Sequence, residues 1–266
     1  MEYKLYSRYS CIKKVRKMTE NEKNSESESG WLAKTSYALF DVGNSAVGAM
    51  HATFIFAVYF ASTVAPEHGT SYWGYTTGAA ALVVAILGPI LGGLADSRAQ
   101  RKLFLGVVVF IGVVATTILW KVEPNESFIW FALVFSFLSI LANELMFVFY
   151  NALLPSVASK ENMGRISGIG WAVGYFGAIV ALVIALAVFI MPEKAPFGLD
   201  KDSSEHVRAT MVLAGIWLLI FSLPLFFFVR EGSAASQLSK PWQIISTGWA
   251  EIGKIPGLRR FLIARM

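Results

Sequence analysis

Six apolar stretches, each long enough to cross a lipid bilayer as a helix, dominate this sequence of 266 residues. A helix needs roughly 17 to 25 apolar residues to span about 30 Å of hydrocarbon. Only 15% of the residues are charged, whereas a soluble domain carries about 25%. Soluble core helices also keep a polar stripe, which 80–90 and 180–190 lack. We therefore predict an all-α polytopic membrane protein whose spans are 37–64, 72–94, 103–120, 128–154, 166–191 and 209–229.

Basic residues are distributed unevenly between the segments that connect these spans. If the N-terminus is cytoplasmic, only Lys121, Lys194, Lys201 and Arg208 fall on the outer side, among several acidic residues. Cytoplasmic loops of membrane proteins carry an excess of Lys and Arg. The pattern predicts cytoplasmic N- and C-termini, in the plasma (inner) membrane. The net charge of +5 then reflects membrane topology, and no nucleic-acid partner is expected.

The chain divides into four segments by composition. A polar segment is expected to be a disordered cytoplasmic tail, and a six-helix bundle follows it. A cytoplasmic connector comes next, with Trp242, Ile245, Trp249 and Ile252 at the spacing of an interfacial amphipathic helix. The last residues look like the start of a seventh helix, so the chain is expected to be a fragment or a truncated product. The four segments are 1–36, 37–229, 230–257 and 258–266.

The first span carries a polar stripe. Asp41, Asn44, Ser45, Gly48 and His51 fall within about a third of the helix circumference at about 100° per residue. Two interpretations of Asp41 stay open, an anchor near the headgroups or a wall of a solute path. For His51, an interhelical hydrogen bond is preferred over a titrating switch.

The fourth span carries Asn143, Glu144 and Asn151. Glu144 stands about ten residues from the inner end of its span, hence roughly 15 Å deep. A carboxyl at that depth must be neutral or have a cationic partner, and intramembrane acids usually mark pathways or proton relays. We therefore take six residues as candidates for a substrate path or for ion coupling: Asp41, Asn44, His51, Asn143, Glu144 and Asn151.

The segment 92–102 between the second and third spans contains glycines, one acid and several bases. It predicts a tight cytoplasmic hairpin in which Asp96 contacts Arg101. With Gly92, these two residues form a candidate cytoplasmic gate. In the fifth span, small residues recur every four positions at Gly170, Gly174 and Ala178, a pattern typical of close helix packing.

These motifs resemble a known family. The segment 92–102 resembles the signature between the second and third helices of the major facilitator superfamily. The segments 40–46, 149–155 and 164–175 are similar to the branch related to vacuolar amino-acid effluxers. The chain departs from the usual pattern at Ser97, Ala99 and Gln100, where the superfamily has a base, a glycine and a base, and at 42–43, where the branch has Trp-Ala.

The resemblance implies a twelve-helix fold of two six-helix halves, with the substrate at mid-membrane between them. This chain would supply the first half and the connector. The implied function is a secondary active transporter that works by alternating access on small solutes, with amino acids as the substrate class. The depth of Glu144 adds protons as the expected coupling ion. The missing C-terminal half or a second subunit would then be a partner, besides the lipid bilayer.

The same residues leave two other classes of function to consider against a complete transporter. One is a truncated half-transporter that acts only as a membrane-embedded binding or regulatory module with a partner subunit. The other is an intramembrane enzyme, which would need His51 and Glu144 to act as a pair or to bind a metal. One histidine and one acid make a poor metal site. No enzyme activity, metal or cofactor is expected.

Overall fold

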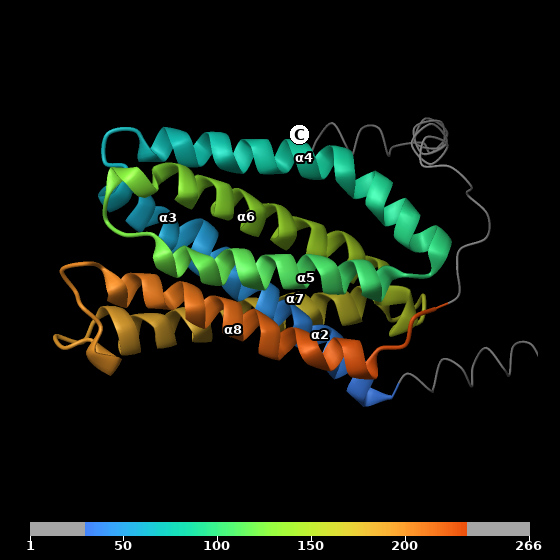
Figure 1. Cartoon of the computed structure of the whole chain (residues 1–266). Coiled ribbons are helices and arrows are strands. Elements are labelled where there is room, and N and C mark those ends of the chain that lie inside the picture. The colour runs from blue at the N-terminus through green and yellow to red at the C-terminus, as the bar shows by residue number, and fades with distance from the viewer. Residues whose placement is uncertain (1–29, 233–266) are drawn as a thin grey trace, which may run out of the picture.

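The computed structural model describes residues 30–232, and every regular element in this range is helical (Figure 1). The six predicted spans are confirmed as six helical segments that are long and apolar enough to cross a membrane. They run over Trp31–Val64, Gly69–Arg98, Arg101–Lys121, Glu126–Ser156, Met163–Ile190 and Glu205–Phe228.

Each span consists of one main helix, and two spans also contain π-helical turns. The π-helical segments are Gly48–Phe54 and Phe60–Val64 in the first span and Ala185–Ile190 in the fifth. The α-helices are α2 (Trp31–Val47), α3 (Phe56–Tyr59), α4 (Gly69–Arg98), α5 (Arg101–Ile118), α6 (Ile129–Ala152), α7 (Met163–Ile184) and α8 (Glu205–Phe228).

The helices form one bundle that is open on one side. In it, α2 packs on α7 and α8, α5 packs on α6 and α8, and α4 packs mainly on α6. The order around the bundle is therefore α7, α2, α8, α5, α6 and α4. Because α4 and α7 each pack mainly on one neighbour, they form the two edges of the opening. Parts of α2 and α6 line the face between them.

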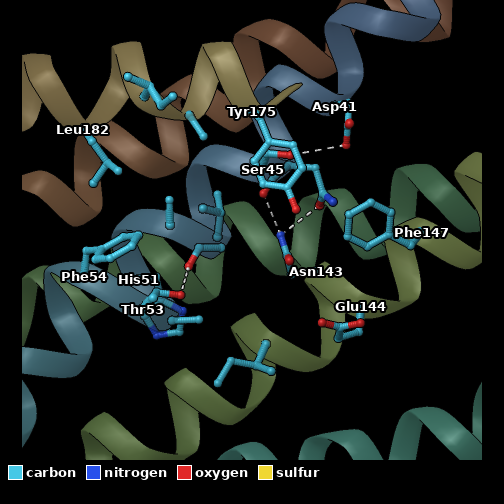
Figure 2. Close-up of a pocket in the computed structure, with 18 of the residues that line it drawn as sticks. Asp41, Ser45, His51, Thr53, Phe54, Asn143, Glu144, Phe147, Tyr175 and Leu182 are labelled. Carbon is cyan, nitrogen blue, oxygen red and sulfur yellow. Dashed lines mark hydrogen bonds between the residues drawn. The ribbon is translucent and has the colours of Figure 1, made fainter. Parts of the chain in front are cut away.

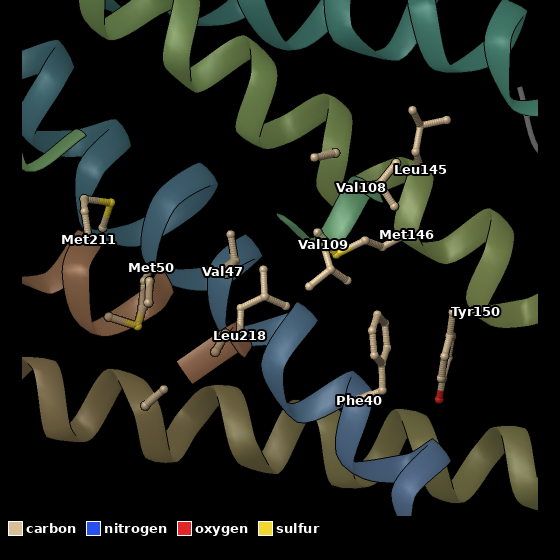
Figure 3. Packing of buried hydrophobic residues seen from close by; sticks show 14 of the residues in the cluster. Phe40, Val47, Met50, Val108, Val109, Leu145, Met146, Tyr150, Met211 and Leu218 are labelled. Carbon is tan, nitrogen blue, oxygen red and sulfur yellow. The ribbon is translucent and has the colours of Figure 1, made fainter. Parts of the chain in front are cut away.

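Buried apolar side chains and close helix contacts hold the bundle together. Phe40 and Met50 of the first span pack with side chains of α5, α6 and α8, including the fully buried Met146 (Figure 3). On the other side of α2, Gly174 faces Asp41 so closely that a Cβ atom would collide with the carboxyl group. The predicted packing role of Gly170, Gly174 and Ala178 is confirmed, since all three are buried along α7.

The boundary of the N-terminal tail differs from the prediction. Helix α2 begins at Trp31, whereas the polar tail was expected to extend to residue 36. Ala33 and Ser36 are buried, so packing against the bundle extends the helix beyond the continuous apolar run. The rest of the predicted tail, the connector beyond residue 232 with its amphipathic helix, and the start of a seventh helix lie outside the described residues.

The hairpin between α4 and α5 is much shorter than predicted. Gly92 and Asp96 belong to α4, and only Ala99 and Gln100 separate the two helices. The Gln100 N–H donates to Ala95 O (3.0 Å) and the Ala99 N–H to Asp96 O (3.4 Å), which is the Schellman arrangement. Ala99 has φ 50° and ψ 43°, so an alanine occupies the left-handed position that usually takes glycine.

Ala99→Gly should stabilise the protein. The left-handed conformation costs an L-residue roughly 1–2 kcal/mol, and the greater freedom of unfolded glycine offsets roughly 0.5–1 kcal/mol of the gain. We expect a net increase in the free energy of unfolding of about 0.5–1 kcal/mol. The apparent midpoint of thermal unfolding in detergent would measure it. The control is Ala81→Gly, on the exposed face of α4, which should lower the same midpoint. An equal decrease of the unfolding midpoint in both variants would contradict backbone strain at Ala99.

Candidate functional site

The first span departs from regular α-helix where it crosses the middle of the bundle. Its π-helical segment Gly48–Phe54 ends at Ile55, whose φ of −109° breaks the helix before α3. Two side chains donate hydrogen bonds to backbone carbonyl oxygens of this segment. Thr53 Oγ1 donates to Gly48 O (3.1 Å), and Trp73 Nε1 donates to Ala52 O (3.3 Å). Irregular backbone at membrane depth is tolerated where it is buried in protein or lines a cavity, and π-helical turns often occur at functional sites.

A pocket of about 410 Å³ lies beside this irregular segment (Figure 2). Its walls come from the first span, from α6 and from α7. Five of the six predicted path residues line it, and Asn151, exposed near the end of α6, does not. Ser45, Thr53, Trp171 and Tyr175 also line it, although the prediction did not include them. The predicted residues in the pocket are Asp41, Asn44, His51, Asn143 and Glu144.

Two asparagines join α2 to α6 in this pocket. Asn143 Nδ2 donates to the backbone oxygen of Asn44 (3.1 Å) and to its side-chain oxygen Oδ1 (2.8 Å). A backbone oxygen can only accept, so the amide orientation of Asn143 is fixed by this pair of bonds. Asn44 is 1% exposed, and its Nδ2 has no partner within residues 30–232.

The two acids of the pocket have different environments. Asp41 is 2% exposed, accepts a hydrogen bond from Ser45 Oγ (3.4 Å) and lies against Gly174 of α7. Glu144 is exposed on the pocket wall and has neither a hydrogen bond nor an ion pair within the part of the chain that the structure describes. A carboxylate without a partner at membrane depth must obtain one from water, a ligand or another chain segment.

His51 links three spans. Its ring is 1% exposed. The Nε2 atom lies 3.1 Å from Ser136 Oγ and the Nδ1 atom lies 3.2 Å from Ser139 Oγ, both on α6. Ser139 Oγ in turn lies 2.7 Å from Thr116 Oγ1 of α5. This geometry matches the interhelical interpretation of His51, because both ring nitrogens are engaged.

The α4–α5 turn carries the contact that the sequence predicted for the candidate gate. Asp96 Oδ1 accepts a hydrogen bond from Arg101 Nε within an ion pair, in which the Asp96 side chain is 42% exposed and that of Arg101 is 12% exposed. The prediction gave no role to Lys102, whose Nζ donates to Phe226 O (2.7 Å) and Val229 O (2.8 Å). Lys102 therefore joins the start of α5 to the end of α8.

Six apolar spans around a polar pocket define an integral, multi-pass membrane protein, and the helix arrangement is that of the major facilitator superfamily. A partially occluded, inward-open xylose transporter XylE from E. coli matches with a TM-score of 0.55 at 17% identity, over 88% of this chain and 55% of that chain. The proton:xylose symporter XylE bound to 6-bromo-6-deoxy-D-glucose matches with a TM-score of 0.54 at 14% identity, over 75% and 44%. At these identities the likeness concerns the fold alone.

The chain belongs to the family described as vacuole effluxer Atg22 like, whose profile matches residues 56–261. It is 28% identical over 203 residues to an uncharacterised MFS-type transporter, YxiO, of Bacillus subtilis (strain 168), covering 74% of this chain and 46% of that protein. It is 24% identical over 210 residues to autophagy-related protein 22 of Eremothecium gossypii, covering 69% and 38%. The chain thus spans about half the length, or less, of these curated relatives. The family is one of transporters and not of enzymes.

His51→Leu should destabilise the bundle. The change removes two buried hydrogen bonds and leaves the hydroxyls of Ser136 and Ser139 with fewer partners, at a cost of roughly 1–3 kcal/mol. A lower apparent midpoint of thermal unfolding in detergent would show it. His68→Leu, in an exposed turn, serves as the control and should change the midpoint little. An equal response of the two variants would contradict a structural role of His51.

Proposed function

We propose that this chain forms one half of a secondary active transporter that moves small solutes across the membrane by alternating access. The observation that carries the proposal is the polar pocket at the irregular part of the first span, with Glu144 unpartnered within residues 30–232. Transporters with this fold place substrate and coupling ions near the bilayer midplane, between two repeats. Membership of an effluxer family supports the same function.

The open face between α4 and α7 carries polar residues that a second helical bundle would shield from lipid. Asn143 and Glu144 would face lipid if nothing covered this side, and polar groups in hydrocarbon cost several kcal/mol each. We propose that a second six-helix bundle, either a C-terminal half or a second subunit, completes the solute path. The greater length of the relatives supports this interpretation.

The polar residues of this half take different parts in the proposed cycle. Asn143 and Glu144 contact the solute, whereas the buried Asp41, Asn44 and His51 shape the walls. Asn151 lies further along the same path. At the α4–α5 turn, the ion pair between Asp96 and Arg101 closes the cytoplasmic side, where Gly92 lets α4 approach Val148 of α6.

We further propose that the solutes include amino acids and that transport is coupled to protons. Glu144 is the coupling carboxyl, because it is the only charged group near the middle of the six spans that is not buried. The other titratable side chains that line the pocket are Asp41, His51 and Tyr175.

Proton-coupled flux can be tested in liposomes that contain the complete gene product. An imposed pH gradient should drive accumulation of radiolabelled amino acids, and a protonophore should abolish it. Glu144→Gln should lose gradient-driven accumulation because it cannot bind and release a proton. Glu126→Gln, in the exposed turn before α6, should behave as the parent protein. Absence of any carrier-dependent solute flux in sealed liposomes would refute the proposed function.

The proposed location is the plasma membrane, with both termini in the cytoplasm. In a background of Cys11→Ser, a membrane-impermeant thiol reagent should label Glu123→Cys in intact cells. It should label Arg98→Cys only after the cells are permeabilised, because the basic α4–α5 turn lies inside. Labelling of Arg98→Cys in intact cells, with Glu123→Cys protected, would reverse the orientation.

A further inference from the structure

The pocket is lined by acidic side chains but by no Lys or Arg. Asp41 and Glu144 are its two charged lining residues, and no Lys or Arg lines it. Throughout residues 30–232, Lys and Arg occur only at the ends of the spans or between them, as at Lys34, Arg165 and Arg208. An anionic group of a solute would therefore find no cationic side chain on this half. A cationic group would find the carboxylate of Glu144, which has no partner within residues 30–232.

Hydrogen-bond acceptors on α6 add to this preference. Both bonds that Asn143 donates go to Asn44, so its Oδ1 atom points away from them as a free acceptor. Within the described residues no donor reaches this oxygen, which stands over Gly48 at 3.8 Å from where a Cβ atom would lie. Glu144 is the next residue on the same helix. Two neighbouring acceptor groups on one pocket wall suit a group with several N–H donors.

Aromatic side chains of α7 line the pocket as well. Trp171 and Tyr175 of α7 line the pocket with their ring centroids 5.8 Å apart, and they are 50% and 60% exposed. Figure 2 shows Tyr175 of α7 and Phe147 of α6 on either side of Asn143. Aromatic faces attract ammonium groups, most strongly where water is excluded. In the described residues, the only cation stacked on a ring is Arg208 over Trp120, so these two rings are unoccupied by a side-chain cation.

We propose that this half of the transporter recognises the protonated primary amine of its solute. A primary ammonium group has three N–H donors. Glu144 and Asn143 Oδ1 accept hydrogen bonds from it, and the rings of Trp171 and Tyr175 stabilise its charge. The apolar part of the solute lies against Ile140, Ile179 and Leu182, which line the same pocket. The inference rests on the proposed function and adds the chemical group that this half selects.

Two probes of nearly equal shape and opposite charge test the proposal. Phenethylamine and 3-phenylpropionate share a phenyl ring and a two-carbon chain, and they end in an ammonium and a carboxylate group. Binding to the complete gene product in lipid nanodiscs would be measured by calorimetry. Phenethylamine should bind and 3-phenylpropionate should not.

Variants then locate the binding group. Glu144→Gln should weaken phenethylamine binding roughly 10- to 100-fold, as expected for loss of a hydrogen bond to a charged group. Trp171→Leu should weaken it about two- to tenfold by removing a cation–π contact. Glu126→Gln, outside the pocket, should bind as the parent protein does. An unchanged unfolding midpoint of Glu144→Gln shows that the variant is folded.

Three results would overturn the inference: tight binding of 3-phenylpropionate, unchanged phenethylamine affinity in folded Glu144→Gln, or binding of neither probe. The last result would arise if a cation of the second bundle already occupied Glu144. Failure of the proposed function is a different outcome. If phenethylamine binds through Glu144 but no solute crosses sealed liposomes, amine recognition stands and transport does not. If solutes without an amine are transported equally well, transport stands and amine recognition does not.

Discussion

The backbone of this protein must satisfy its own hydrogen bonds, because hydrocarbon offers no partner for a free N–H or C=O group. That constraint makes the six spans helical, and it makes every departure from the helix informative. The first span departs at Gly48–Phe54 and again at Ile55. Side chains of Thr53 and Trp73 bind carbonyls at this point, and the polar pocket lies next to it. The irregular backbone and the candidate site are therefore one feature of the fold.

Hydrogen bonds join α5 and α8 at both of their ends, on the side of the bundle opposite its opening. Lys102, in the first turn of α5, binds carbonyls at the end of α8. At the opposite end of the pair, Arg208 in the first turn of α8 donates a hydrogen bond from Nη1 to the backbone oxygen of Trp120 (3.1 Å), a residue that follows the end of α5. Cations near helix C-termini are favourable because unpaired carbonyls carry partial negative charge there. Between the two ends, Gly215 approaches α5 so closely that a side chain would collide with Thr117.

On the open side, small residues bring helices together around a buried acid. Gly174 makes room for the carboxyl of Asp41, and Gly177 makes room for Val42. Larger residues at these positions would push α7 away from α2 and widen the pocket between them. The shape of the pocket thus depends on glycines whose role is packing, so a packing motif and the proposed solute path coincide in α7.

The sequence by itself determined the six spans, because the lipid solvent requires long apolar helices regardless of their packing. It also predicted the Asp96–Arg101 contact, which is local in the chain. Only the tertiary structure decided how the remaining polar residues are used. Hydropathy does not reveal that His51 is enclosed by Ser136 and Ser139 while Glu144 is left without a partner in the described residues. It also gives no sign that Ala99 ends α4 or that Lys102 binds α8. These outcomes depend on which helices become neighbours, and that is set by close packing between residues far apart in the sequence.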